Sequence, residues 1–265
     1  MKLDLFQADA FTNKLFGGNP AAIVPLKKWL PEETMQQIAM ENNLAETAFF
    51  VPSKNKEADY DIRWFTPAIE INLCGHATLA SAFLVFDILK AKKKKVVFSS
   101  KSGLLTVIRG KKILEMDFPS WSPEKITEYP AELLASLGNP EIAGIYQNRE
   151  YLVELTNEEA VKNCQPDFSI MKKLGKMVII TAPGKGVDFV SRFFAPGVGI
   201  DEDPVTGSAH AQLIPFWSEK LGKDKLHALQ LSKRGGELWC RQLSDERVYM
   251  AGAALHYMTG TIFIK

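Results

Sequence analysis

The chain has 265 residues, of which 46% are hydrophobic and 24% charged, and its formal net charge is +1. These values are typical of a globular protein, and a charge so close to zero gives no field that would attract nucleic acid or an anionic membrane. The N-terminus is too polar for a signal peptide and the best apolar run, residues 79–86, is too short to cross a membrane, so we expect a cytoplasmic protein without nucleic-acid or membrane partners.

The first half of the chain predicts strands with two helices among them. Gly17, Gly18 and Asn19 predict a tight loop, because Gly and Asn tolerate a positive φ. Pro31 opens a helix that runs to about Asn43, with acidic residues in its first turn. Residues 76–89 are apolar nearly all round, which predicts a buried helix. The predicted strands are residues 3–6, 22–25, 47–52, 61–65, 96–100, 104–109 and 113–118.

The second half repeats this order and several of its motifs. A helix near 169–174, a buried helix over 208–221 and strands over 177–181, 187–194, 228–232 and 236–243 are predicted. The repeated motifs are Arg63-Trp64-Phe65-Thr66-Pro67 with Arg192-Phe193-Phe194-Ala195-Pro196, Gly75-His76-Ala77 with Gly207-Ser208-Ala209, and Lys101-Ser102-Gly103 with Lys233-Arg234-Gly235. This internal duplication predicts an α+β fold of two similar lobes, each a curled, mostly antiparallel sheet around a central helix.

We predict an N-terminal lobe over residues 1–118 and a C-terminal lobe over 119–265, with the linker in 119–130. The last strand, residues 260–265, could pair with either lobe. Loops and helix starts of the two lobes are expected to meet at a seam, where a small-molecule site usually lies.

Five motifs closely resemble those of the PhzF-like isomerases of phenazine biosynthesis, in the same order over essentially the whole chain. They are Phe16-Gly17-Gly18-Asn19-Pro20-Ala21-Ala22, Glu46-Thr47-Ala48-Phe49, Arg63-Trp64-Phe65-Thr66-Pro67, Cys74-Gly75-His76-Ala77-Thr78 and Asp203-Pro204-Val205-Thr206-Gly207-Ser208-Ala209. The resemblance implies the two-lobed diaminopimelate epimerase-like fold and a homodimer. It also implies a biosynthetic isomerisation of a dihydro-hydroxyanthranilate-like amino acid without cofactor or metal.

The resemblance places the family's catalytic glutamate at Glu46 and a functional aspartate at Asp203. A carboxyl group at Glu46, followed by apolar residues, would resist ionising in an apolar seam and could deliver and retrieve protons near neutral pH. Without the resemblance, Glu46 would be taken for a solvated strand residue. Asp203, in an acidic loop before Pro204, could equally be a turn residue, and the family assigns it a role beside a substrate amine.

His76 and Ser208 are the second residues of the two buried helices. Unpaired backbone N–H groups at a helix start attract anions, so the segments Gly75-His76 and Gly207-Ser208 are predicted to bind a substrate carboxylate. His76 could also move a proton or orient the ring. Helix capping is the alternative role for both side chains, and it is compatible with binding. Asn19 with its two glycines is expected to shape the loop and stands outside the predicted catalytic set.

The cysteines separate this chain from the two-thiol epimerases of the fold. Cys74 precedes the first buried helix, whereas no cysteine occupies the matching loop of the second half, and Cys164 and Cys240 lie in other segments. A two-thiol racemase is therefore not expected, and the three cysteines are expected to be free thiols. Cys74 as a single base, or as a small buried residue, remains open. The four histidines are too scattered to predict a metal chelate.

The sequence thus predicts a cofactor-independent isomerase that acts on a small, carboxylate-bearing, cyclic or unsaturated amino acid. A neutral Glu46 would pass a proton between carbons of the conjugated system, while His76 and Asp203 hold the ring and the amine. Two alternatives stay open: an epimerase with Cys74 as its one base, and a ligand-binding or scaffold protein that has lost catalysis.

Overall fold

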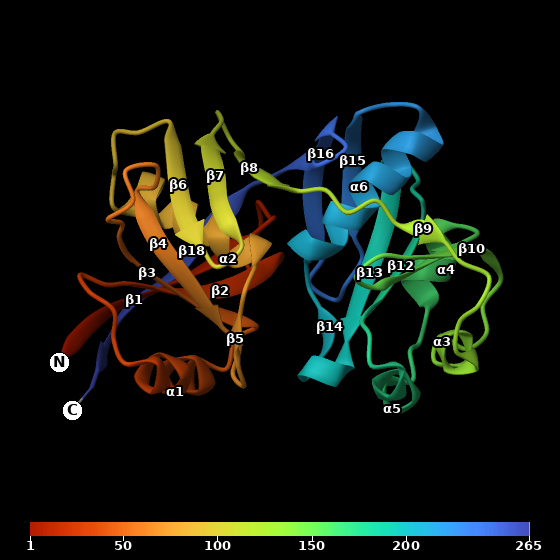
Figure 1. Cartoon of the computed structure of the whole chain (residues 1–265), viewed down its shortest axis with the longest axis horizontal. Coiled ribbons are helices and arrows are strands. Elements are labelled where there is room, and N and C mark those ends of the chain that lie inside the picture. Colours follow the sequence, from red (N-terminus) through yellow and green to blue (C-terminus); the bar gives the residue numbers. More distant parts are fainter. Residues whose placement is uncertain (265) are drawn as a thin grey trace. The chain divides into compact units, whose positions relative to one another are not determined.

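The described residues, 1–264 of a computed structural model, divide into two units of similar construction (Figure 1). Unit 1 is Met1–Phe118 together with the C-terminal segment from Ala251, and unit 2 is Pro119–Met250. The final strand, which the sequence left open, therefore belongs to unit 1. No helix of residues 1–264 is both long enough and apolar enough to span a bilayer.

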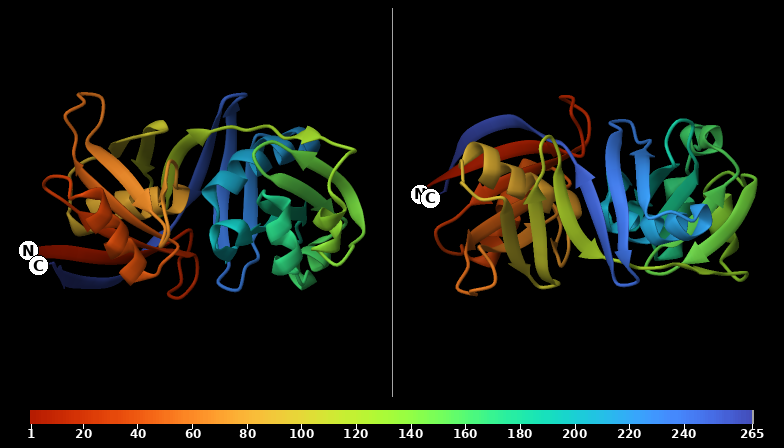
Figure 2. Two further views of the ribbon diagram at one scale, coloured as in Figure 1. Left: turned by 60° about the horizontal axis from the view of Figure 1, so that its bottom comes forward. Right: turned by 90° about the horizontal axis from the view of Figure 1, so that it is seen from above.

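Unit 1 is a mostly antiparallel sheet with two parallel pairings, β2 with β3 and β4 with β6. The two views of Figure 2 show β18 (blue) running along β1 (red), and the register confirms an antiparallel pair. The strands are β1 (Lys2–Ala10), β2 (Asn19–Pro25), β3 (Glu46–Pro52), β4 (Tyr60–Phe65), β5 (Glu70–Ile71), β6 (Lys95–Ser100), β7 (Gly103–Arg109), β8 (Leu114–Pro119) and β18 (Ala254–Phe263).

Two helices cover opposite faces of β2 and β3. Helix α1 (Glu32–Asn42) packs through Met35 and Ala39 against Phe49 and Val51, and it lies below these strands in Figure 1. Helix α2 (Gly75–Phe83), which continues as the π-helix η1 (Leu84–Ile88), lies against the other face. Because side chains alternate along a strand, the residues of β3 that do not face α1 point toward α2.

Unit 2 repeats the same plan around helix α6 (Gly207–Leu221), whose residues are buried over most of its length. Its elements are β9 (Glu124–Lys125), α3 (Ala131–Ala135), β10 (Ile142–Gln147), β11 (Tyr151–Leu155), α4 (Glu158–Asn163), α5 (Phe168–Met171), η2 (Lys172–Leu174), β12 (Val178–Pro183), β13 (Phe189–Ala195), η3 (Pro196–Val198), β14 (Ile200–Asp203), α6, β15 (Lys225–Gln230) and β16 (Gly236–Ser244). Strand β17 (Arg247–Gly252) leads the chain back into unit 1.

The pairing pattern of unit 2 matches that of unit 1 strand for strand. β11 and β12 are parallel like β2 and β3, and β13 and β15 are parallel like β4 and β6. Each unit also contains an arginine–glutamate pair at the same register: Arg63 with Glu70, and Arg192 with Glu202. The duplication read from the sequence is therefore present in the strand pairing and in the side-chain contacts.

Most predicted elements are found close to their expected bounds, and the differences lie mainly in unit 2. The sequence missed β5, β9, β10, β11, β14 and β17, and it placed no helix at α3 or α4. The first buried helix begins at Gly75, one residue earlier than expected, and changes to a π-helix at Leu84. The last strand begins at Ala254 rather than Gly260.

Glu150 is a buried carboxyl group immediately before β11. Burial raises its pKa to about 7, and Gln212 of α6 donates a hydrogen bond to it. The folded state therefore holds this proton more tightly than the unfolded state does. Between about pH 4.5 and 7 this group should lower the free energy of unfolding as pH rises, by up to about 1.4 kcal/mol per pH unit. Replacing Glu150 by Gln should remove this pH dependence of the free energy of unfolding, measured by urea denaturation at pH 5 and pH 8. The same change at exposed Glu141 should leave the pH dependence unchanged.

Candidate active site

Glu46 is the first residue of β3, and its side chain lies on the face of the strand turned toward α2. Its neighbours Thr47 and Phe49 take the opposite face, where Asn42 of α1 donates to the Thr47 hydroxyl. Glu46 is only 8% exposed. The alternation of the strand therefore places a carboxyl group in the interior of unit 1, beside the start of the central helix.

His76, the second residue of α2, meets Glu46 directly. Its Nε2 lies 3.1 Å from Oε2 of Glu46, and both residues are buried. The other ring nitrogen, Nδ1, lies 3.1 Å from Nδ2 of Asn19 and 3.6 Å from Sγ of Cys74. The sequence motifs include the loop at Asn19, the strand at Glu46 and the helix start at Cys74–His76. Residues of all three segments meet at the imidazole ring of His76.

Burial and the charge of Glu46 act in the same direction on the pKa of Cys74 and in opposite directions on the pKa of His76. Burial, together with the charge of Glu46, raises the pKa of the Cys74 thiol to about 11, so the thiol keeps its proton at neutral pH. For His76, burial lowers the pKa, whereas negative charge on Cys74 and Glu46 raises it, and the net result is a pKa well above the usual value.

The start of α2 is not capped by a side chain. Cys74 holds the cap position with extended backbone (φ −141°, ψ 116°) and its thiol makes no capping hydrogen bond. Instead, the Thr78 hydroxyl donates back to the Cys74 carbonyl oxygen. Gly75 begins the helix and is buried. The His76 side chain faces Glu46 and makes no capping hydrogen bond, so helix capping, the alternative role for this histidine, is wrong.

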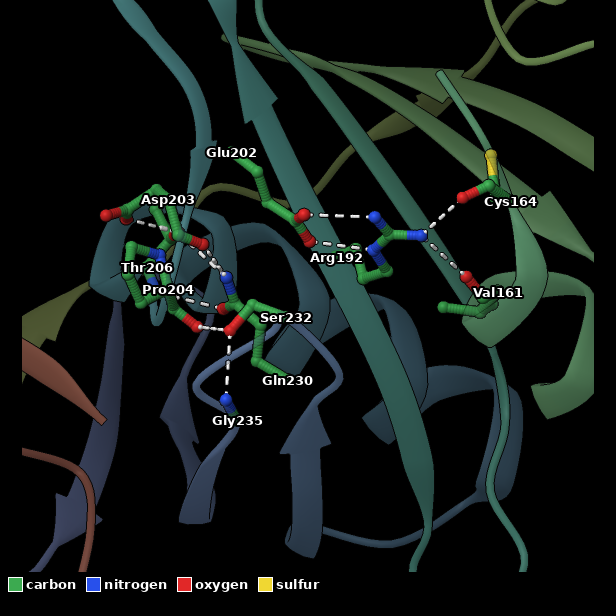
Figure 3. A network of polar contacts seen from close by, with 10 residues as sticks. All are labelled: Val161, Cys164, Arg192, Glu202, Asp203, Pro204, Thr206, Gln230, Ser232 and Gly235. Atoms are coloured by element: carbon green, nitrogen blue, oxygen red, sulfur yellow. Dashed lines mark hydrogen bonds and ion pairs between the residues drawn. The ribbon is translucent and has the colours of Figure 1, made fainter. Parts of the chain in front are cut away.

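Asp203 ends β14 and belongs to a hydrogen-bonded loop that leads into α6 (Figure 3). The Thr206 hydroxyl donates to Asp203 Oδ2, and Nε2 of Gln230 contacts both the Asp203 carbonyl oxygen (2.8 Å) and the Thr206 hydroxyl oxygen (3.1 Å). Oε1 of Gln230 accepts from the Thr206 backbone N–H. The buried Gln230 amide therefore orients the Thr206 hydroxyl toward the Asp203 carboxylate.

The outer side of this loop is held by Arg192. Its guanidinium donates to both carboxylate oxygens of Glu202, at 2.7 and 3.0 Å, and to the carbonyl oxygens of Val161 and Cys164 (Figure 3). Glu202, the neighbour of Asp203 in the acidic loop, is therefore a structural ion-pair partner.

Ser208 and Gly207 occupy in α6 the places that His76 and Gly75 occupy in α2. Ser208 is half-buried, and Gly207 is the first helical residue. Thr206 holds the cap position that Cys74 holds in unit 1, again without a capping hydrogen bond. The second thiol of a two-thiol epimerase is thus replaced by a hydroxyl that donates to Asp203. Substrate binding by Ser208, Gly207 and Gly75 stays a prediction.

Glu46, Cys74 and His76 are also close enough to hold a metal ion. One donor atom from each lies within 4.8 Å of the other two. This mixed oxygen, sulfur and nitrogen set would suit Zn²⁺ once the thiol lost its proton. A metal-free reaction nevertheless stays the prediction from the family resemblance.

Sequence reasoning missed two residues of these networks, Asn19 and Gln230. Asn19 was expected only to shape its loop, yet it lies completely buried against His76. Its place could have been found from strand phase, because Asn19 and Ala21 share a face of β2 and Ala21 pairs with Glu46. Gln230 lies at the end of β15, and nothing in the local sequence points to the Asp203 loop.

Comparison with known proteins settles the family. The family model described as phenazine biosynthesis-like protein matches residues 8–260. The chain belongs to this family. An uncharacterized isomerase of Pseudomonas aeruginosa is 48% identical over 263 residues, which cover 99% of both chains. A crystal structure of a PhzF-family phenazine biosynthesis protein from Enterococcus faecalis matches with a TM-score of 0.93 at 45% identity, over 100% of both chains.

The resemblance read from the five motifs is thereby confirmed, and the relatives named as isomerases identify the protein as an isomerase. The fold class is confirmed as well. A hydroxyproline epimerase from Agrobacterium vitis matches with a TM-score of 0.65 at 8% identity, over 98% of this chain and 92% of that one. At that identity the likeness shows a shared epimerase-like fold and nothing about the substrate.

Proposed function

We propose that this isomerase moves a proton within a small, carboxylate-bearing, cyclic unsaturated amino acid such as a dihydro-hydroxyanthranilate, with Glu46 as the proton carrier. The contact between Glu46 and His76 is the observation that carries the proposal. A buried carboxyl group that lies 3.1 Å from an imidazole nitrogen is suited to general acid–base catalysis. Membership of a family of isomerases supports the reaction type.

The reaction requires no net change in protons. Glu46 would pass a proton between two carbons of the conjugated system, giving one proton to one carbon and taking one from the other, while the electron pair moves through the double bonds between them. Backbone N–H groups at the uncapped start of α2 would favour the substrate carboxylate, since the helix dipole is positive there. Hydrogen bonding of the substrate amine by Asp203, and of its carboxylate by Ser208, Gly207 and Gly75, is predicted from the family resemblance.

The proposal is tested by incubating the protein in D2O with a dihydro-hydroxyanthranilate and related unsaturated amino acids. Incorporation of deuterium at a ring carbon, followed by NMR, is the expected result. If no candidate exchanges but one binds tightly, the protein is a ligand-binding member of the fold, the alternative from another functional class.

A one-base epimerase that uses Cys74 is the runner-up among enzymes, and the thiol's environment speaks against it. A thiol with a pKa of about 11 is protonated at neutral pH and is a poor base. Replacing Cys74 by Ala should therefore lower hydrogen exchange by less than about tenfold, well short of the 10²–10⁴-fold loss typical of a missing acid–base group. Loss on that larger scale, with circular dichroism unchanged, would favour the epimerase.

A homodimer and a cytoplasmic location also stay predictions, the first from the family resemblance. Three free, buried cysteines agree with a reducing compartment. Size-exclusion chromatography with light scattering tests the first.

A further inference from the structure

Two buried polar side chains of unit 2 stand where unit 1 has alanines. Glu150 lies immediately before β11 and Gln212 lies in α6, and both are completely buried. We propose that they form a two-bond pair of a protonated carboxyl group and an amide, which fixes the first half of α6 on β11 and loosens when Glu150 ionises. The inference rests on the proposed function for its meaning in catalysis, but the pair itself can be measured without any substrate.

One of the two bonds is present in the structure. Nε2 of Gln212 donates to Oε2 of Glu150. The two remaining oxygens, Oε1 of Glu150 and Oε1 of Gln212, are buried, and neither has a hydrogen-bond partner among residues 1–264. A carboxylate and an amide carbonyl can only accept hydrogen bonds, so these two oxygens can satisfy each other only if Glu150 carries a proton. The protonated acid would close the second bond and leave no oxygen of the pair unsatisfied.

The internal duplication shows that the fold itself does not require this pair. By strand register, Glu150 holds the place that Ala21 has in unit 1. Gln212 holds the place of Ala80, because each lies five residues after the first residue of its helix. Both alanines are completely buried. Burying a carboxyl group costs free energy that two alanines avoid, so the polar pair answers a requirement that is particular to unit 2.

A break in the hydrogen bonding of α6 is such a requirement. Pro215 lies inside the helix and has no N–H, so the Ala211 carbonyl oxygen has no donor four residues on. The backbone N–H of Trp121 donates to this oxygen instead, at 2.8 Å. In α2 the matching position is Phe83, which keeps its N–H. The first half of α6 therefore depends on contacts outside the helix, and Gln212 lies on that side of the break.

Burial and the surrounding charges act in opposite directions on the pKa of Glu150. Burial is the larger effect and raises the pKa to about 7, whereas the positive charges of Arg149 and Lys176 lower it. Both cations are exposed. Farther along β11, Glu154 forms an ion pair with Lys220 of α6. The pair with Gln212 is thus complete below about pH 7 and loses one of its two bonds above it.

The consequence concerns the start of α6. An ionised Glu150 would set a carboxylate oxygen against the carbonyl oxygen of Gln212, and the two acceptors repel each other. Ser208 lies one helical turn before Gln212 on the same side of α6. The segment Gly207-Ser208, which is predicted to bind the substrate carboxylate, is therefore held in place below about pH 7 and loosened above it.

The test follows the intact protein by NMR from pH 5 to pH 8, with ¹³C-labelled glutamate side chains and ¹⁵N-labelled amides. Cδ of Glu150 should report a protonated acid at pH 5 and titrate near pH 7. The side-chain amide of Gln212 and the backbone amides of Gly207 and Ser208 should shift with the same midpoint. His210 of α6 titrates separately, because burial lowers its pKa to about 4. A Glu150 that is ionised at pH 5, or α6 signals that ignore its titration, would overturn the proposal.

Two matched variants separate this pair from a general effect of pH. Glu150→Gln keeps a two-bond pair, now between two amides, that no longer titrates, so the Ser208 signal should stay in place from pH 6 to pH 8. Glu154→Gln neutralises another buried carboxyl group of β11 and should leave the response of Ser208 unchanged. A response at Ser208 that survives Glu150→Gln would refute the role of the pair. The deuterium-exchange assay judges the proposed isomerisation separately.

Discussion

Replacing Glu46 by Gln is expected to lower the rate of deuterium incorporation into substrate by about 10²–10⁴-fold. The Gln side chain has the same shape and can keep the 3.1 Å contact with His76 Nε2, so the fold should be kept. What the variant loses is the ability to bind and release a proton at that position. The measurement is the rate of deuterium appearance at ring carbons by NMR in D2O.

A matched control is available five residues earlier in the chain. Glu41 is an exposed residue of α1, and Glu41→Gln removes the same charge without touching the interior of unit 1. This variant should exchange at the wild-type rate. Full activity in Glu46→Gln would contradict the proposed proton carrier, and equal losses in both variants would point to an effect of net charge.

The meeting of Glu46 with His76 was predictable only in part. The motifs around both residues identify the family, but neither spacing nor periodicity states which face of β3 the carboxyl group takes. That face is decided by α1, which packs on Thr47, Phe49 and Val51 and leaves Glu46 on the other side. Tertiary packing thus selects one of two faces that are almost equally apolar in the sequence.

Asn19 shows a different limit. A Gly-Gly-Asn-Pro segment is a strong turn signal, and the turn alone explains the choice of residues. Its contact with His76 depends on the parallel register of Ala21 with Glu46, a pairing between two strands that helix α1 separates in the chain. Pairings of that kind cannot be read from local pattern.

Two of the elements missed in unit 2 give only a weak local signal. β10 contains Ala143 and Gly144, which weaken a strand signal, and α4 is too short to show helical periodicity. The duplication itself would have located β11, had the parallel pairing of β2 with β3 been known. An internal repeat therefore helps most to locate strands and helices when the secondary structure of one copy is already known.

The second large expected effect concerns stability and the two equivalent arginines, Arg192 and Arg63. Arg192→Met should lower the free energy of unfolding by about 3 kcal/mol, the scale found when one partner of a buried ion pair is removed. Glu202 would lose both of its hydrogen bonds, and the carbonyl oxygens of Val161 and Cys164 would lose their donor. The side chains of Arg192 and Glu202 are only 11% and 20% exposed, so water compensates little. Urea denaturation should show a lower midpoint with an unchanged slope.

Arg63→Met in unit 1 is the built-in comparison, because Arg63 pairs with Glu70 at the equivalent register. Here the loss should be smaller, about 1 kcal/mol, since Lys101 remains 2.6 Å from Glu70 and the further partner Glu32 is 68% exposed. Within residues 1–264 no second cation pairs with Glu202. The asymmetry therefore tests whether the remaining cation, Lys101, compensates Glu70 for the lost arginine. Equal losses at Arg63 and Arg192 would show that the repeated geometry sets the energy and that the surroundings of each pair do not.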